Sequence, residues 1–157
     1  MASGRPTPDT ACVPNYPEFL GAERGTALAA RPGGMPKRVL VVDDQQYLRD
    51  IQVLLLKEAG YVATAISSGV EALARLSDLS PDLILLDMSM PVMDGRQFLA
   101  HLRDTDRWAM TPVILSSGHD IDEMEAMRAP IVEVLHKPFS DRALLERVRH
   151  MIGDAEE

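Results

Sequence analysis

The feature that most constrains the fold is an alternation of two residue patterns that begins near residue 37. Short runs rich in Val, Ile and Leu alternate with longer stretches in which apolar residues recur at helical spacing. The apolar runs lie at 38–44, 61–66, 82–87, 112–117 and 131–136, and the helical stretches at 45–60, 67–80, 95–103, 119–128 and 140–152. Strands that alternate with helices are typical of an α/β domain with a parallel sheet. The sequence therefore predicts an α/β fold of five strands and five helices.

Several residues mark where the predicted helices begin and end. Ser67 or Ser68 and, later, Ser140 are expected N-caps, because a hydroxyl accepts a hydrogen bond from an unpaired backbone N–H of the first turn. Asp94–Gly95 indicates a turn and the start of the stretch at 95–103. Gly60 is expected to end the first helix.

Polar side chains follow the predicted strands at their carboxyl ends. In strand order they are Asp43 and Asp44, Asp87, Ser116 and Ser117, and, just past the fifth strand, Lys137. The second strand, 61–66, ends without a polar residue. In open parallel sheets, ligands bind beyond the carboxyl ends of the strands, where the strand order reverses. An edge position for the second strand fits this pattern, so the sequence predicts the strand order 2-1-3-4-5.

The same residues indicate phosphoryl chemistry with a metal ion. Asp43, Asp44 and Asp87 would repel one another in one cleft unless cations neutralise them. Carboxylate oxygens suit Mg²⁺ (or Mn²⁺), which keeps several waters and takes one or two protein carboxylates. Lys137 supplies a positive charge and Ser116 a hydroxyl. Because the chain shows no phosphate-binding glycine loop and no arginine finger, the natural product is an aspartyl phosphate on Asp87.

Composition argues against several other classes of protein. The 157 residues suit one domain with some excess, and the net charge of −8 disfavours a basic nucleic-acid-binding surface. No apolar stretch approaches the roughly 20 residues of a membrane span, and the amino terminus lacks the apolar core of a secretory signal. The single cysteine, Cys12, excludes an internal disulfide and fits a reducing compartment. We therefore expect a cytoplasmic protein without direct nucleic-acid binding or membrane insertion.

The first 36 residues differ in composition from the rest of the chain. They are rich in Pro, Gly, Ala and Thr, and their apolar residues follow no period, so burial cannot offset the entropy lost on ordering. We predict a flexible N-terminal extension at 1–36, in which only Tyr16–Leu20 is apolar enough to dock on the domain or on a partner. The domain itself is expected at 37–153, and a C-terminal tail at 154–157.

Four segments, taken together, resemble a known family. They are VLVVDDQ at 39–45, LILLDMSMPVMDG at 83–95, PVILSSG at 112–118 and LHKPF at 135–139. In this order and at these spacings they resemble the receiver domain of two-component response regulators, over about 37–152. The resemblance implies a CheY-like, flavodoxin-like (βα)5 three-layer sandwich with a parallel sheet of order 2-1-3-4-5. The expectation is a stand-alone receiver, because the chain stops after the last predicted helix.

The resemblance also implies roles for individual residues around a metal ion. Asp87 corresponds to the phospho-acceptor and, together with Asp44, to a direct ligand of Mg²⁺ (or Mn²⁺). The backbone carbonyl of Ser89 would complete the ligands from the protein. Asp43 would hold the metal through water.

Around the phosphoryl group, Ser116 corresponds to the hydroxyl that bonds it and Lys137 to the lysine that pairs with it. The family also implies a cis peptide between Lys137 and Pro138. Val134 departs from the family, because many receivers have Tyr or Phe three residues before the lysine, and the rotamer of that ring follows the hydroxyl. Without the ring, the signal would travel through backbone shifts of the loops after the third and fourth strands. Pro130, expected to end a short fourth helix, departs from the usual Gly-Ala turn.

The expected function is that of a single-domain response regulator in a phosphorelay. A histidine kinase or a histidine phosphotransfer protein would donate a phosphoryl group to Asp87, and the phosphorylated domain would act on a downstream protein target. The protein would be a signalling domain and not an enzyme, with at most self-phosphorylation and self-dephosphorylation activity.

Two alternative functions stay open. A phosphatase or phosphotransferase with a phosphoaspartate intermediate usually carries a second acid two residues after the nucleophile, where this chain has Ser89. A receiver-like scaffold would bind partners without phosphorylation. The intact set of phospho-acceptor, metal ligands, hydroxyl and lysine argues against the scaffold.

Overall fold

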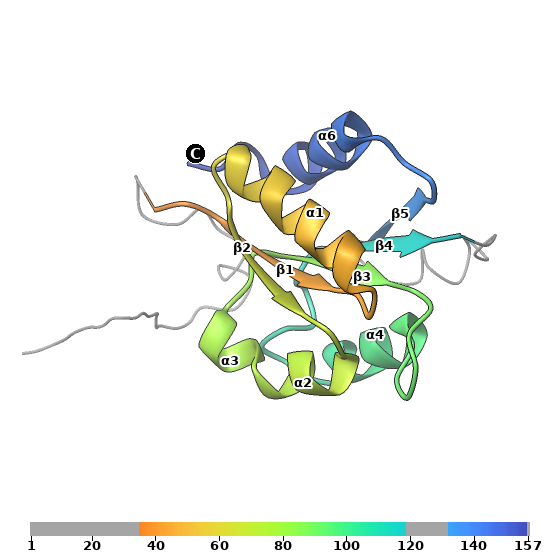
Figure 1. Ribbon diagram of the computed structural model, residues 1–157. Coiled ribbons are helices and arrows are strands. Elements are labelled where there is room, and N and C mark those ends of the chain that lie inside the picture. The colour runs from red at the N-terminus through yellow and green to blue at the C-terminus, as the bar shows by residue number, and fades with distance from the viewer. Residues whose placement is uncertain (1–34, 119–131, 157) are drawn as a thin grey trace, which may run out of the picture.

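The computed structural model describes residues 35–118 and 132–156, which form one sheet with helices on both faces (Figure 1). The strands are β1 (Arg38–Val42), β2 (Val62–Ile66), β3 (Leu83–Asp87), β4 (Val113–Ser117) and β5 (Val132–His136). The helices of these residues are α1 (Gln46–Glu58), α2 (Gly69–Ala74), α3 (Leu76–Leu79), α4 (Gly95–Arg103) and α6 (Asp141–Ile152). All five predicted strands are confirmed to within a residue or two at each end. The helix predicted at 119–128 and residues 1–34 of the extension predicted at 1–36 lie outside the described residues.

The sheet has the order β2-β1-β3-β4-β5, and every neighbouring pair is parallel. The predicted α/β fold and strand order are therefore confirmed. Every residue of β3 and of β4 is buried, as their unbroken apolar runs indicate for strands that are covered on both faces. β2 lies at one edge of the sheet and has exposed positions.

Two apolar clusters fill the space on the two faces of the sheet. One joins Val39 and Val41 of β1 to Leu56 of α1 and Leu144 of α6. The other joins alternate strand residues, such as Leu40 and Val42, to side chains of α2, α3 and α4. This alternation follows from the two-residue period of a strand. Figure 1 shows the resulting three layers, with α1 and α6 on one side and α2, α3 and α4 on the other.

Three predicted helix starts are confirmed, whereas the prediction of one continuous helix at 67–80 is wrong. Ser68, Asp94 and Ser140 each accept a hydrogen bond from the backbone N–H three residues later. The single helix predicted at 67–80 is two short helices, because the backbone leaves helical geometry at Arg75, with φ −106° and ψ 6°. Leu76, the first residue of α3, is 3% exposed in the core.

The turn after α6 packs back onto the domain. The backbone N–H of Lys37 donates to the carbonyl of Ala155 at 2.8 Å, and the hydroxyl of Tyr61 donates to the carbonyl of Gly153 at 2.7 Å. Ala155 itself is buried in the cluster beside α1 and α6. Across residues 35–118 and 132–156, no helix is both long enough and apolar enough to cross a bilayer.

Candidate functional site

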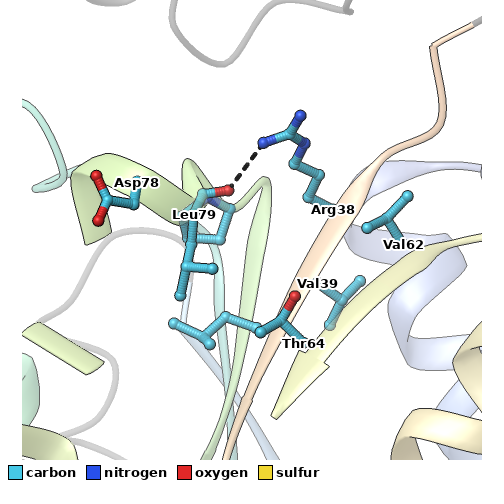
Figure 2. A pocket seen from close by; sticks show the side chains of 8 residues that line it. Arg38, Val39, Val62, Thr64, Asp78 and Leu79 are labelled. Carbon is cyan, nitrogen blue, oxygen red and sulfur yellow. Dashed lines mark hydrogen bonds between the residues drawn. The ribbon is translucent and has the colours of Figure 1, made fainter. Parts of the chain in front are cut away.

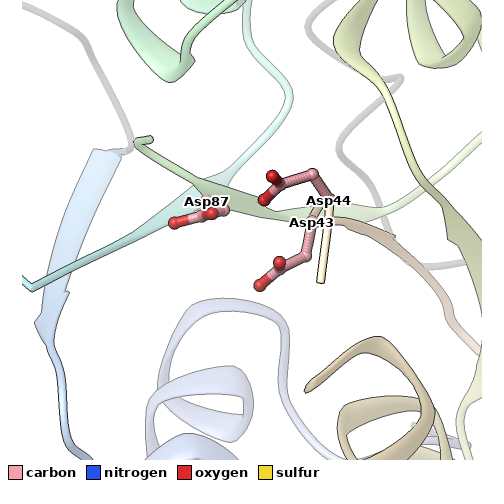
Figure 3. Close-up of side chains that lie close together, drawn as sticks. All are labelled: Asp43, Asp44 and Asp87. Atoms are coloured by element: carbon pink, nitrogen blue, oxygen red, sulfur yellow. The ribbon is translucent and has the colours of Figure 1, made fainter. Parts of the chain in front are cut away.

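Three carboxylates converge at the carboxyl edge of the sheet. Asp43 and Asp44 follow β1, Asp87 ends β3, and β1 and β3 are neighbours in the sheet. One carboxylate oxygen from each residue lies within 4.8 Å of the others. Figure 3 shows the side chains of Asp43 and Asp44 leaving the end of β1 in different directions, beside Asp87 at the end of the adjacent strand. Asp43 and Asp87 are buried, whereas Asp44 is exposed, so the group opens to solvent on one side.

Lys137 places a positive charge among these acids. Its ammonium lies 3.1 Å from Oδ1 of Asp87 and 4.0 Å from Oδ2 of Asp43. The backbone N–H of Lys137 donates to the carbonyl of Ser117 at 2.7 Å, which fixes the chain after β5 against the end of β4. The peptide between Lys137 and Pro138 is cis, as the family resemblance implied.

Ser116 is buried and lies directly opposite Asp87 in the register of β3 and β4. The backbone N–H of Met88 donates to the carbonyl of Ser116 at 2.9 Å, and this bond continues the pairing one residue beyond Asp87. Ser117 is also buried. Ser89 is exposed, and its backbone N–H donates to Oδ1 of Asp87 at 3.4 Å.

The environment of Asp43 fits a cation site. Burial is the main cause that raises the pKa of Asp43 above 3.8, and the nearby charges of Asp87 and Asp44 raise it further. The backbone N–H of Gln45 donates to Oδ1 of Asp43 at 2.8 Å and, like the charge of Lys137, opposes this rise. Oδ2 of Asp43 is buried without a hydrogen-bond partner among the described residues. A buried, unpaired carboxylate oxygen beside two other acids is the donor set that a hydrated divalent cation satisfies.

The first residue of α4 has a role that the sequence did not reveal. Gly95 begins α4, and a Cβ at this position would lie 2.9 Å from the Cα of Met88 and 3.1 Å from the carbonyl oxygen of Asp87. The helix therefore approaches the backbone of the acid more closely than any larger residue allows. The Asp-Gly pair indicates a turn in sequence, but the close approach depends on how α4 packs. Met90 is buried in the core, and Met88 and Met93 pack against it.

Val134 and Pro130 are the two departures from the family pattern. Pro130 is outside the described residues. Val134 lies in β5 and packs against the core cluster of α2, α3 and α4. A shallow cavity of about 80 Å³ lies at the opposite, amino ends of β1 and β2, where Arg38 donates to the carbonyl of Leu79 (Figure 2). None of the clustered acids lines this cavity.

A doubly wound α/β domain with an acid cluster at its strand-order reversal is the class that this fold and site define. Within that class, residues 39–149 match the family described as the response regulator receiver domain. The chain therefore belongs to the response regulator receiver family. Receiver domains act as signalling modules that interact with histidine kinases and downstream targets, and they bind Mg²⁺ at an acidic pocket.

Individual relatives agree with this assignment. The chain is 34% identical over 118 residues to the Regulator of RpoS from Escherichia coli K12, covering 74% of this chain and 34% of that protein. It is 32% identical over 114 residues to the protein PilG from Pseudomonas aeruginosa, covering 71% of this chain and 84% of that protein. Among solved structures, the chemotaxis response regulator CheY4 of Vibrio cholerae superposes with a TM-score of 0.69 at 29% identity, covering 74% of this chain and 99% of that chain.

Several of the curated relatives are longer proteins. The chain spans about half or less of the length of the transcriptional regulatory protein TrcR from Mycobacterium tuberculosis (48%) and of the Regulator of RpoS (34%). The match in each case covers 74% to 78% of this chain. The region that this chain shares with these longer relatives is therefore the receiver domain.

Proposed function

We propose that this receiver accepts a phosphoryl group on Asp87 from a histidine kinase or a histidine phosphotransfer protein and signals through a downstream protein target. The observation that carries the proposal is the setting of Asp87. Asp87 is 3% exposed, and its carboxylate lies 3.1 Å from the ammonium of Lys137 and within 4.8 Å of a carboxylate oxygen of each of the other two acids. A carboxylate held between a cation and a metal-binding pair of acids is suited to act as a nucleophile toward phosphorus.

In the proposed reaction, one carboxylate oxygen of Asp87 forms a bond to phosphorus as the bond from phosphorus to the imidazole nitrogen of the donor histidine breaks. The imidazole leaves with the electron pair and takes a proton from solvent. Lys137 and the hydroxyl of Ser116 would contact the phosphoryl oxygens, where negative charge accumulates. Their placement at the ends of β5 and β4, beside Asp87, supports these roles.

Asp44, Asp87 and the carbonyl of Ser89 would hold Mg²⁺ (or Mn²⁺), with Asp43 acting through water. When bound, the metal neutralises the acids and stabilises the charge of the transferring group. Two observations favour a direct contact from Asp44 and a water-mediated one from Asp43. The buried, unpaired Oδ2 of Asp43 can be reached through one water, whereas the exposed carboxylate of Asp44 can turn to the ion.

Radiolabelled phosphoryl transfer from a histidine kinase, or from acetyl phosphate, tests the proposal. We expect Mg²⁺-dependent labelling that alkali removes, as an acyl phosphate requires, and that Asp87→Asn abolishes. Asp50→Asn is the matched control, because Asp50 is an exposed acid on α1. Equal labelling of Asp87→Asn and the wild type would refute the assignment. Turnover of phosphate esters would favour the phosphotransferase alternative, and partner binding that ignores beryllofluoride would favour the scaffold.

A further inference from the structure

The turn between β1 and α1, residues 43–45, presents two of the three clustered acids and is held by a side chain of the helix that follows. The guanidinium of Arg49 donates to the backbone carbonyl of Asp43 at 2.7 Å. We infer that Arg49 is a positioning residue, which orients this turn so that Asp44 meets Asp87 at the distance a divalent cation requires. The inference rests on the proposed function and adds a residue to it.

The start of α1 lacks the side-chain cap that usually fixes a helix N-terminus. Gln45 occupies the N-cap position without a side-chain hydrogen bond, and the first turn contains no acidic residue. Arg49 supplies the missing restraint from inside the helix. Its backbone N–H donates to the carbonyl of Gln45 at 3.0 Å, while its side chain reaches back to Asp43. Arg49 therefore bonds both to the turn at 43–45 through its side chain and to the N-cap residue of α1 through its backbone.

The restraint acts on Asp44 through the peptide plane. The carbonyl of Asp43 and the backbone nitrogen of Asp44 belong to the same planar unit, so holding the oxygen fixes the direction in which Asp44 leaves the chain. On its other side, the N–H of Gln45 donates to Oδ1 of Asp43 at 2.8 Å. Asp44 is exposed, and no hydrogen bond or ion pair of its own side chain is found among the described residues. Its carboxylate thus depends on the backbone for its position.

The choice of acceptor also matters for metal binding. A guanidinium that paired with a carboxylate would occupy the oxygens that a cation needs. Arg49 instead binds a carbonyl, and in the described part of the chain its side chain has no ion pair with the nearby acids. It therefore brings positive charge to the turn and leaves Oδ2 of Asp43 and the carboxylate of Asp44 to the metal.

The experiment compares Mg²⁺ affinity, by titration calorimetry at constant ionic strength, in the wild type, Arg49→Met and Arg142→Met. Methionine keeps the apolar stem and removes the donor. Arg142 is the matched control, because it lies in the first turn of α6, its side chain is 86% exposed and it pairs with Glu146 on its own helix, so its loss removes the same charge. We expect the dissociation constant to rise about 10-fold in Arg49→Met and to change less than about two-fold in the control.

Labelling kinetics separate positioning from simple stabilisation. In Arg49→Met, the rate of labelling by acetyl phosphate should approach the wild-type rate at saturating Mg²⁺, and the Mg²⁺ concentration for half-maximal rate should rise as the dissociation constant does. Arg49→Lys, which keeps a charged donor, should recover part of the affinity. A helix-stabilising role alone would lower the melting temperature and leave the Mg²⁺ dissociation constant unchanged.

An unchanged dissociation constant in folded Arg49→Met, or an equal change in Arg142→Met, would overturn the inference. If Arg49→Met does not fold, Arg49→Gln gives the same comparison, since its shorter amide cannot span the distance, and wild-type affinity in that variant overturns the inference as well. Absence of Mg²⁺ binding by the wild type would instead overturn the proposed function, so the two failures are distinguishable.

Discussion

Asp43→Asn is expected to stabilise the metal-free domain, because Asp43 is a buried carboxylate that lies beside two others. Its residue is 1% exposed, and one of its carboxylate oxygens has no hydrogen-bond partner in the described part of the chain. Burial, followed by the charges of Asp87 and Asp44, raises its pKa, and these causes prevail over the Gln45 hydrogen bond and the charge of Lys137. The ionised form of Asp43 therefore opposes folding at neutral pH.

Coulomb's law gives the size of this effect. At an effective dielectric constant of about 20, two unit charges 4.8 Å apart interact by about 3.5 kcal/mol, and two charges 4.0 Å apart by about 4 kcal/mol. The repulsion from Asp44 and Asp87 thus exceeds the attraction to Lys137, and solvent around exposed Asp44 screens part of the difference. We expect Asn at position 43 to raise the free energy of unfolding by about 1–2 kcal/mol at neutral pH, or Tm by about 4–8 °C.

The pH dependence has a defined sign. Because the pKa of Asp43 is higher in the folded chain than in the unfolded chain, the folded state binds the proton more tightly. The wild type therefore gains stability relative to Asp43→Asn as the pH falls through the raised pKa toward 3.8. The advantage of the variant should be full above the raised pKa and absent below 3.8.

Thermal unfolding followed by circular dichroism, in EDTA and across this pH range, measures the difference. Asp50→Asn, which removes an exposed acid from α1, controls for the change in net charge. Added Mg²⁺ should stabilise the wild type more than Asp43→Asn, because a ligand stabilises the state that binds it. The reasoning is refuted if Asp43→Asn is less stable than the wild type in EDTA at neutral pH, or if its advantage persists at the lowest pH.

Three further substitutions test other features of the fold and site. Gly95→Ala should slow labelling of the acceptor and cost about 1–3 kcal/mol of stability, because its Cβ would lie 2.9 Å from the Cα of Met88; a wild-type labelling rate would contradict this. Val92→Asn should raise the free energy of unfolding by about 1 kcal/mol, because Val92 has φ 69°, where Asn is less strained, and is 91% exposed, so no packing is lost. Denaturant titration measures this change, and a lower midpoint in the variant would contradict the prediction. Gln52→Leu should also stabilise, by about 1–2 kcal/mol, because Gln52 is 4% exposed and its Oε1 accepts no hydrogen bond among the described residues; a fall in Tm would count against this account.

The strands and helix caps were predictable because their signals are local. An apolar run such as Leu83–Leu86 specifies a strand buried on both faces, and Ser140 before a helical pattern specifies an N-cap. The inward face of α1 was not predictable in detail. Leu48 and Ile51 of its apolar stripe are only partly buried, whereas Gln52 is buried, because packing against the sheet and α6 sets the rotation of the helix.

The convergence of the acids was also predictable, since the carboxyl ends of neighbouring parallel strands meet at one edge of a sheet. The sequence could not show that Arg49 reaches back to Asp43, because a long side chain on a helix has several acceptors within reach. Nor could it show the close approach of Gly95, which depends on the angle at which α4 meets β3. Both features depend on tertiary packing beyond the local pattern.

The surroundings of Val134 bear on how a structural change at the acid cluster could be transmitted to the rest of the domain. Val134 replaces the aromatic residue expected from the family resemblance, and its backbone carbonyl accepts a hydrogen bond from Arg147 of α6 at 3.1 Å. The same guanidinium pairs with Glu133 at 3.1 Å. The middle of β5 is thus connected to α6 through the backbone of Val134 and the side chain of Glu133. Val134 itself has no ring whose rotamer could change.

Two backbone hydrogen bonds connect the site to the end of β4. The N–H of Met88, next to Asp87, donates to the carbonyl of Ser116, and the N–H of Lys137 donates to the carbonyl of Ser117. A phosphoryl group on Asp87 would draw Lys137 and the Ser116 hydroxyl toward it. Both movements would act on the end of β4, because Ser116 belongs to that strand and the backbone of Lys137 is hydrogen-bonded to Ser117. Because β3 and β5 are each paired with β4 and not with each other, β4 is the element through which their displacements combine. This geometry supports the prediction that the signal leaves through the loops after β3 and β4 rather than through a side chain of β5.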